Sequence, residues 1–406
     1  MRQHLTRRDV LKLGAGATGA AALGAPLRPA NAAEGDITLC GIFSQTGAYA
    51  VFGRDTDRGI KLALSEAGGK ALGHDIRYII RDDQTNPGVG VQQVNDAIDH
   101  DNAKYFVGVA SSSVGLAIEQ VCGQKHAMFL TSVGADEITG KSCNVYTFRW
   151  AVPTYGAVRA TMYPFLKRFP NAKRWFTITP SYVFGDSLLH NVQDVAKEHN
   201  LDLVGNAYHA LGATEYSSII TAAIAAKPDV IALLNFGGDA IKTIKTAQEF
   251  GVKNSAKLLY VWSGGLLDYQ GIGPAAMEDL YVGCQYWHEA SADTRKASEP
   301  YQKAYGEPMG YVGASAYIEA KLAITAMERA KSIDPLAAAK ALQGYSYIGP
   351  TGHETIRGFD HQVIKPYYFL RGKGEKAMQN QWDFVETLGA ASYPVPQSES
   401  QCKLAS

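Results

Sequence analysis

The segment KYFVGVASSS, residues Lys104–Ser113, joins a short apolar run to three consecutive serines. Residues 106–110 contain β-branched side chains and are too few for a helix, which predicts a buried parallel strand. A helical pattern follows over residues 114–121. Serine hydroxyls and backbone N–H groups should therefore meet at the carboxyl end of a strand and the amino end of a helix.

This junction favours a small anion such as a carboxylate, because unsatisfied amides and the positive end of the helix dipole converge there. The alternative is that the serines only cap the helix, since serine is a preferred N-cap residue. One serine is enough for a cap. Three in a row leave spare hydroxyls, so the pattern favours a binding site.

Strand and helix patterns alternate on both sides of this segment. This order predicts parallel sheets covered by helices on both faces. The alternation restarts after residue 150, so we expect two α/β lobes with a first crossing at residues 150–154. Strands are predicted at 37–43, 75–81, 106–110, 127–132, 145–150, 175–179, 202–208, 230–236, 258–262 and 280–286, and helices at 55–67, 89–98, 114–121, 155–168, 184–198, 216–226 and 240–250.

The last third of the chain does not form a third lobe. Its helices are predicted at 294–305, 317–330 and 335–342, and two strands with antiparallel hairpin character at 354–359 and 366–371. These helices and strands should complete the two sheets, so the chain should cross between the lobes several times. We expect these crossings to form a hinge. We expect lobe 1 to comprise residues 36–150 and 283–349, lobe 2 residues 151–282 and 350–390, and a tail residues 391–406.

The amino terminus has the pattern of an export signal. Thr6-Arg7-Arg8-Asp9-Val10-Leu11-Lys12 is a twin-arginine motif, and Ala30-Asn31-Ala32 is a small-residue cleavage site. We therefore expect residues 1–32 to be a signal peptide and the mature chain to be a soluble periplasmic protein. The G-x-G-x-x-G match at residues 14–19 lacks a preceding strand and would leave with the signal.

Composition excludes several kinds of partner. Lys plus Arg and Asp plus Glu both number 39, with no basic tract, which argues against nucleic acid. No cofactor, metal or phosphate motif survives removal of the signal. The cysteines of an exported chain are disulfide candidates. We expect a local Cys122–Cys143 disulfide, with Cys402 able to pair with Cys284 or Cys40.

Several short motifs occur in a fixed order along the mature chain. They are Gly41–Gly47 with Phe52-Gly53, Arg81-Asp82-Asp83, Val107–Ser112, Phe148-Arg149, Tyr182–Gly185 and Gly349–Gly352. In order and spacing, the chain resembles the type I periplasmic solute-binding proteins of the branched-chain amino acid class, which feed ABC importers.

The resemblance implies a ligand carboxylate at Ser111 and Ser112, and backbone contacts from the loop that begins at Ser132. The family usually places an acidic residue for the ligand's ammonium after the strand that here ends at Trp262. This chain has Ser263-Gly264-Gly265 there. Asp239 or Asp268 could substitute for it, although their spacing differs from that of the family's acid. Because an unpaired buried ammonium is expensive, we expect a ligand without an obligatory ammonium group.

Aromatic residues lie at strand ends and loops where the two lobes would face each other. Each alone fits core packing, but as a group they fit pocket walls. Arg149 could bind a carboxylate bidentately or brace the hinge through carbonyl groups. Trp262 and Tyr155 belong to the aromatic group. The ligand-binding residues that we predict are Phe52, Ser111, Ser112, Ser132, Val133, Gly134, Trp150, Tyr182, Phe184, Phe236 and Gly264.

These features predict a monomeric periplasmic binding component of an ABC importer. Its partners would be a membrane permease and a small carboxylate-bearing solute: an amino acid, an aromatic or aliphatic acid, or an amide. A ligand-sensing receptor of the same fold is the alternative. A serine hydrolase would need a G-x-S-x-G turn, and the serine loop has no such glycines.

Overall fold

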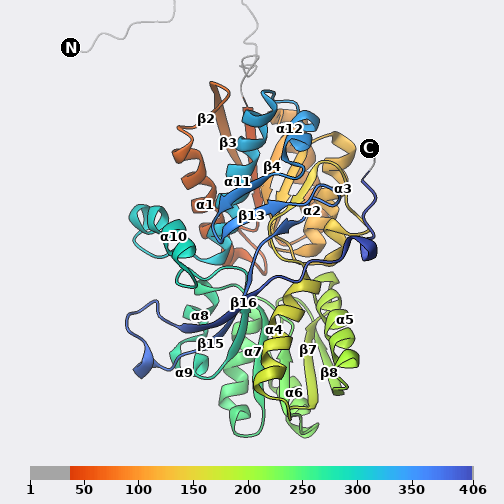
Figure 1. Cartoon of the computed structure of the whole chain (residues 1–406), viewed down its shortest axis with the longest axis vertical. Helices are drawn as coiled ribbons and strands as arrows, with labels where there is room; N and C mark the ends of the chain where they lie inside the picture. The colour runs from red at the N-terminus through yellow and green to blue at the C-terminus, as the bar shows by residue number, and fades with distance from the viewer. Residues whose placement is uncertain (1–36, 405–406) are drawn as a thin grey trace, which may run out of the picture. The chain divides into compact units, whose positions relative to one another are not determined.

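The computed structural model describes residues 37–404 (Figure 1). The predicted signal peptide, its cleavage site and the glycine-rich match at residues 14–19 lie outside the described residues. Within the described part, no helix is long and apolar enough to cross a membrane.

The first lobe is built on a sheet of six strands in the order β2-β3-β1-β4-β5-β6. All neighbouring pairs are parallel except β2–β3. Side chains alternate between two faces, so that Leu39 packs against α1 and α11 while Cys40 packs against α2 and α3. The strands are β1 (Ile37–Phe43), β2 (Lys70–Ala71), β3 (His74–Asp82), β4 (Tyr105–Gly108), β5 (Met128–Thr131) and β6 (Thr147–Arg149). The helices are α1 (Gly53–Glu66), α2 (Pro87–Asp101), α3 (Ser112–Lys125), α11 (Tyr311–Ala330) and α12 (Pro335–Leu342).

The second lobe is built on a sheet of seven strands in the order β16-β15-β11-β10-β9-β7-β8. Strands β7 to β11 pair in parallel, and β15 and β16 extend the sheet antiparallel. The strands are β7 (Arg174–Pro180), β8 (Asp202–His209), β9 (Val230–Leu233), β10 (Lys257–Ser263), β11 (Tyr281–Cys284), β15 (Tyr367–Gly372) and β16 (Val385–Ala391). The helices are α4 (Thr154–Arg168), α5 (Val183–Glu198), α6 (Ser217–Ala225), α7 (Gly238–Glu249), α8 (Leu266–Ile272) and α9 (Pro274–Met277).

The chain passes between the sheets more than once, as the crossings of the last third predicted. It leaves the first sheet after β6, and after β11 it enters α10 (Ala292–Tyr305) and then α11, which packs against β4 and β5. It re-enters the second sheet at β15.

The two late strands predicted from the sequence are antiparallel but do not pair with each other. β13 (Gly352–Ile356) joins β12 (Ser346–Gly349) and β14 (Val363–Ile364) in a small sheet of three strands, whereas β15 pairs with β11 and β16.

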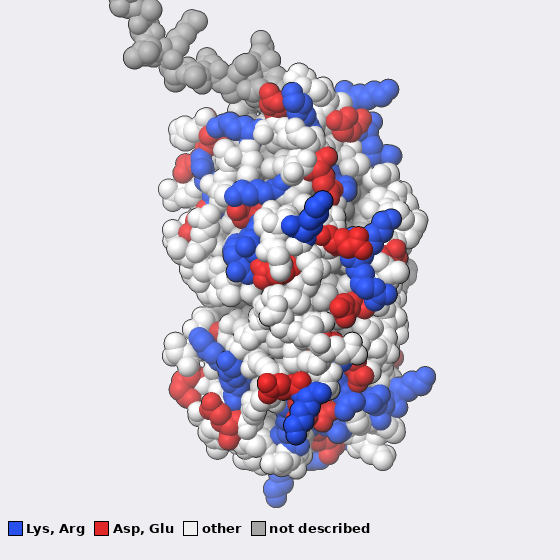
Figure 2. Space-filling view, turned by 90° about the vertical axis from the view of Figure 1, so that its left-hand side faces the viewer, with Lys and Arg blue, Asp and Glu red and all other residues white. Residues whose placement is uncertain are grey.

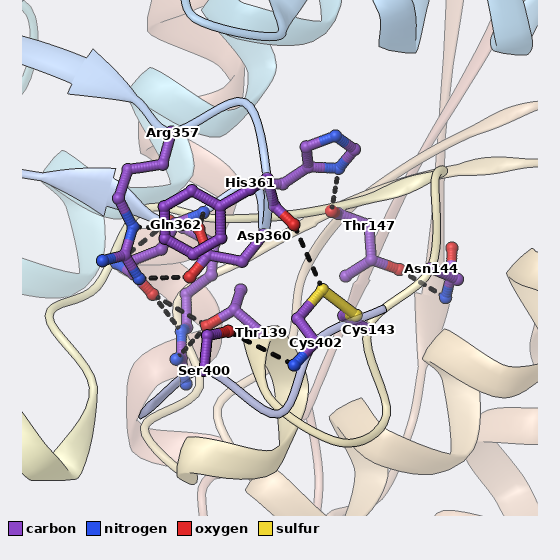
Figure 3. The surroundings of a disulfide bond; sticks show 12 residues. Thr139, Cys143, Asn144, Thr147, Arg357, Asp360, His361, Gln362, Ser400 and Cys402 are labelled. Carbon is purple, nitrogen blue, oxygen red and sulfur yellow. Dashed lines mark hydrogen bonds and ion pairs between the residues drawn. A yellow bond between two sulfur atoms is a disulfide. The ribbon is translucent and has the colours of Figure 1, made fainter. Parts of the chain in front are cut away.

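The predicted Cys122–Cys143 disulfide is wrong. Cys143 pairs with Cys402, with a Cα–Cα distance of 5.6 Å (Figure 3). Cys122 is a free thiol on the apolar face of α3, in the cluster that fills the space between α2, α3 and the sheet. Proximity along the chain predicted the pairing, but the helix turns the Cys122 side chain into this core. The alternatives for Cys402 are also excluded, since Cys40 and Cys284 are free and buried.

Candidate functional site

A cavity lies beyond the carboxyl ends of the parallel strands of both sheets, where open α/β folds place their ligands. The space inside it and around its mouth that no protein atom fills is about 500 Å³, open solvent included. The first sheet and α1 contribute Thr56, Gly108, Val109, Ala110, Ser132 and Gly134 to its lining. The second lobe contributes Tyr182, Phe184, Phe236 and Trp262, and α11 contributes Tyr311, Val312, Ser315, Ala316 and Glu319.

The backbone after β4 has an uncommon conformation where it borders the cavity. Gly108 and Val109 both have positive φ, of 114° and 72°. Positive φ in a β-branched residue is a genuine outlier, and such strain concentrates at functional sites. A Cβ atom on Gly108 would lie 2.6 Å from the carbonyl oxygen of Ile42, so the turn also requires glycine.

The serine hydroxyls have different surroundings. Ser111 is the N-cap residue of α3, but its side chain makes no capping hydrogen bond. The Ser112 hydroxyl accepts a hydrogen bond of 3.2 Å from the backbone N–H of Ala135. Both serines are buried directly behind the cavity, whose lining includes Ala110 but neither serine. The Ser111 side chain therefore does not cap α3.

Aromatic rings form one side of the cavity. Phe184 meets Trp262 edge to face at a centroid distance of 5.3 Å and Phe236 at 6.3 Å. Phe52 stacks on Phe236 at 4.8 Å, outside the lining. Trp150 is also outside it: its ring stacks with Tyr311, and its indole N–H donates to Glu354 at 2.7 Å. These two rings thus support the lining rather than form it.

Residues of the loop after β5 also differ in whether they line the cavity. Ser132 and Gly134 line the cavity, whereas Val133 lies against Gly115 of α3. A Cβ atom at Gly134 would be 2.6 Å from the ring of Phe184. Gly264 is not in the lining, and its N–H donates to the Asp268 carboxylate at 2.7 Å.

Two tyrosines, of which Tyr182 lines the cavity, join the lobes. The hydroxyls of Tyr49, in the loop after β1, and Tyr182, before α5, are 2.5 Å apart. Burial raises the pKa of both phenols, so both are neutral and one donates to the other. The structure therefore has its lobes closed around the cavity.

Several lining residues were not predicted from the sequence, and Glu319 is the charged one among them. Its carboxyl group accepts hydrogen bonds from the Ser132 hydroxyl and, at 2.9 Å, from the N–H of Gly108. Burial raises its pKa well above the usual range. The signal was available: Ser315, Ala316 and Glu319 recur at helical spacing on the buried face of α11.

The two acids that the sequence offered as substitutes lie outside the lining. Asp268 accepts from the Tyr260 hydroxyl at 2.6 Å, and burial raises its pKa to about 6. Asp239 accepts from the N–H of Gly212 at 2.9 Å. Both carboxylates therefore form hydrogen bonds within the second lobe.

Arg149 is held by neutral acceptors next to the hinge. Its guanidinium donates to Gln362 at 2.6 Å, to the Thr139 hydroxyl and to the carbonyl of Ala135. It does not line the cavity. This geometry matches the second role considered from the sequence, in which Arg149 braces the hinge through carbonyl groups.

Tyr155 lines a separate depression and stacks on the Arg159 guanidinium at 3.6 Å. Between residues 37 and 404, no three His, Cys, Asp or Glu side chains are grouped so as to hold a metal ion.

The sequence of this chain is similar to the sequences of known proteins. A family model described as periplasmic binding protein matches residues 36–377. A Leu/Ile/Val-binding protein homolog 7 of Brucella abortus (strain 2308) is 25% identical over 361 residues, covering 84% of this chain and 86% of the relative.

Solved structures are similar over nearly the whole described part. An amino acid ABC transporter substrate-binding protein from Pseudomonas fluorescens Pf-5 is 43% identical, with a TM-score of 0.86, and the match covers 91% of this chain and 99% of that one. A solute-binding protein from R. palustris in complex with benzoate has a TM-score of 0.81 at 21% identity, covering 91% of this chain and 100% of that one. The second likeness shows the fold alone.

Proposed function

Because this chain belongs to the periplasmic binding protein family, we propose that it is the substrate-binding component of an ABC importer of the branched-chain amino acid class. It captures a small carboxylate-bearing solute between its lobes and presents it to a membrane permease. The similarity to an amino acid ABC transporter substrate-binding protein at 43% identity supports this role.

The observation that carries the proposal is the cavity itself. Rings of the second lobe and backbone of the first border one space, and the Tyr49–Tyr182 hydrogen bond joins the two lobes next to it. A binding protein of this kind traps its ligand by moving two lobes about a hinge. No reaction is needed for that task, and we propose that the protein is not an enzyme.

The remaining parts of the proposal concern export and assembly. The twin-arginine motif would direct the folded chain to the periplasm, where it would act as a monomer. The lobes would divide as 36–150 with 283–349 and 151–282 with 350–390. On the visible face of the molecule, acidic and basic side chains are interspersed, which suits a small-molecule ligand better than nucleic acid (Figure 2).

Trp262 provides the test of solute binding, because its indole ring borders the cavity. Titration with leucine, isoleucine, valine, phenylalanine and benzoate should change the tryptophan fluorescence for at least one of them, in a saturable way. The Tyr155→Phe variant, altered in the separate depression, should give the same curve. Absence of saturable binding for every solute would count against the proposal.

We further propose that the ligand's carboxylate binds at Ser111 and the amino end of α3. The Ser111 hydroxyl does not cap the helix, and Ser111, although buried, directly follows Ala110 of the cavity lining. Ser111→Ala should remove one charge-assisted hydrogen bond, which is worth about 1.5–3 kcal/mol, or roughly ten- to a hundredfold in affinity.

Calorimetric titration of the Ser111→Ala variant measures this loss, and its thermal unfolding without ligand should match that of the wild type. Ser113→Ala is the matched control, because Ser113 is half-exposed on the first turn of the same helix. An unchanged affinity in the Ser111→Ala variant would show that the ligand's carboxylate binds elsewhere.

A further inference from the structure

A buried lysine lies where the chain crosses between the two sheets. The hinge segments are residues 150–153 after β6, residues 285–291 after β11 and residues 361–366 before β15. Lys365 belongs to the third segment and is only 2% exposed. Its side-chain nitrogen donates a hydrogen bond of 2.8 Å to the backbone carbonyl of Gln285 in the second segment. The same nitrogen lies 4.2 Å from the centre of the Trp150 ring in the first segment. This amine therefore joins the three hinge segments.

Amide side chains hold the same segments together. The buried side chain of Gln285 accepts a hydrogen bond of 2.9 Å from the N–H of Val152 and donates one of 2.8 Å to its carbonyl. Gln362 donates to the carbonyl of Ala151 at 2.8 Å. Because a hinge motion rotates such segments against one another, the surroundings of Lys365 change with the angle between the lobes.

The site accommodates both charge states of the amine. Its two acceptors are the backbone carbonyls of Gln285 and, at 3.3 Å, of Pro366. A neutral amine has two N–H donors, and these two carbonyls satisfy both. An ammonium has a third donor, for which the face of the Trp150 ring offers a cation–π contact. Lys365 can therefore gain or lose a proton while the fold around it stays the same.

The titratable groups that act on this amine belong to other strands. Glu354 of β13 accepts hydrogen bonds from the Trp150 indole at 2.7 Å and from Thr351. Burial raises the pKa of Cys284 of β11. Burial lowers the pKa of Lys365 to about 7, although the charge of Glu354 raises it. Lys365 therefore changes its charge near neutral pH, while the thiol stays neutral. Burial also raises the pKa of the neighbouring phenols, which are those of Tyr286, Tyr311, Tyr347, Tyr367 and Tyr368.

We propose that Lys365 makes the closure of the lobes, and with it the affinity for the solute, dependent on pH. This inference rests on the proposed function, because it concerns the same movement of two lobes about a hinge. Opening separates the hinge segments at the amine and admits water, which favours the ammonium form. Closure returns the amine to its buried carbonyls and favours the neutral form. Closure is thus accompanied by release of a proton.

The direction of the effect follows from the two forms. Below about pH 6.5, Lys365 is protonated in the open and the closed form alike, so closure does not depend on pH. Above about pH 7 the closed form holds it neutral, whereas a solvated lysine stays protonated up to about pH 10. Rising pH therefore favours the closed form. The hinge also adjoins the cavity, because the Trp150 ring stacks on Tyr311 of the lining at a centroid distance of 6.4 Å.

Calorimetric titration of the full mature chain at about pH 6 and about pH 8.5 measures the coupling. The probes are leucine, phenylalanine and benzoate. The affinity for a probe that binds should rise by about 3- to 30-fold over this range, and the heat should depend on the buffer because a proton is released. Small-angle X-ray scattering of the ligand-free chain is the second readout. Its radius of gyration should be smaller at the higher pH.

Two variants fix the charge of the hinge. Lys365→Arg stays charged and should bind at both pH values as the wild type binds at the lower one. Lys365→Met carries no charge and should bind at both as the wild type binds at the higher one. Lys373→Met is the matched control. Lys373 pairs with Asp383 within the second lobe at 2.6 Å, so its substitution should leave the pH dependence of the wild type intact.

The outcomes separate this inference from the proposed function. If a probe binds but neither the affinity nor the radius of gyration of the wild type changes with pH, the role of Lys365 is refuted and solute binding stands. A pH dependence that persists in both Lys365 variants also refutes it. If none of the three probes binds, the proposed function fails. The scattering of the wild type then still decides the inference, and it does so even where a variant does not fold.

Discussion

Replacing Cys143 and Cys402 by serine should lower the free energy of unfolding by up to about 5 kcal/mol. The disulfide joins residues separated by 259 positions, so it removes a large part of the conformational freedom of the unfolded chain. In the chain-entropy model the effect grows with the logarithm of loop length, which places this bridge near the top of the usual range.

The disulfide also connects the tail that follows the second sheet to the first lobe. β16 belongs to the second sheet, whereas Cys143 lies in the loop between η2 (Asp136–Thr139) and β6 of the first lobe. The tail after Ala391 therefore ties one lobe back to the other covalently, in addition to the hinge segments. Loss of the bridge should free this tail.

Urea unfolding of the wild type and of the Cys143→Ser/Cys402→Ser variant measures the effect. Reductant added to the wild type should shift its midpoint toward that of the variant, and reductant added to the variant should do nothing, because Cys40, Cys122 and Cys284 are free thiols. Equal midpoints for oxidised wild type and variant would contradict the predicted stabilisation.

Arg149→Met should destabilise the fold by about 3–5 kcal/mol. Arg149 is 1% exposed, and its guanidinium supplies donors to Gln362, Thr139 and the carbonyl of Ala135. Methionine fills part of the volume but removes these buried hydrogen bonds from a charged donor, each of which is worth about 1.5–3 kcal/mol. Burial lowers the pKa of Arg149 only to about 10, so the residue is charged at neutral pH.

Arg371→Met provides the control for Arg149→Met. Arg371 pairs with Asp279 and Glu386 at the surface, where ion pairs are worth about 0–1 kcal/mol. Denaturant unfolding of both variants should therefore give a difference of at least about 2 kcal/mol. Similar losses for the two substitutions would show that the Arg149 network is not a brace.

The alternation of strands and helices could be predicted from the sequence because its causes are local. Strands such as β1, β4, β5 and β9 are short, fully buried runs, and the helices between the strands have apolar residues at regular helical spacing. The missed elements lack such a signal. β16 alternates poorly and is mostly exposed or half-buried, and β2 and β14 have only two residues each.

The site could be predicted only where it depends on local backbone. The serine loop and the loop after β5 follow from strand–helix junctions, and Gly134 and Ser132 do line the cavity. Glu319 reaches the same space from a helix about two hundred residues further along the chain, so only the packing of α11 on β4 and β5 brings it there. The pairing of Cys143 with Cys402 depends on tertiary structure in the same way.

Native mass spectrometry of the protein purified from its host, under conditions that retain bound solutes, tests whether the chain binds a solute. We expect the mature chain to carry one small molecule that bears a carboxylate and is released on unfolding. Protein that carries no small molecule, and that binds none of the amino acids or organic acids offered afterwards, would contradict the account of this chain as a solute-binding protein.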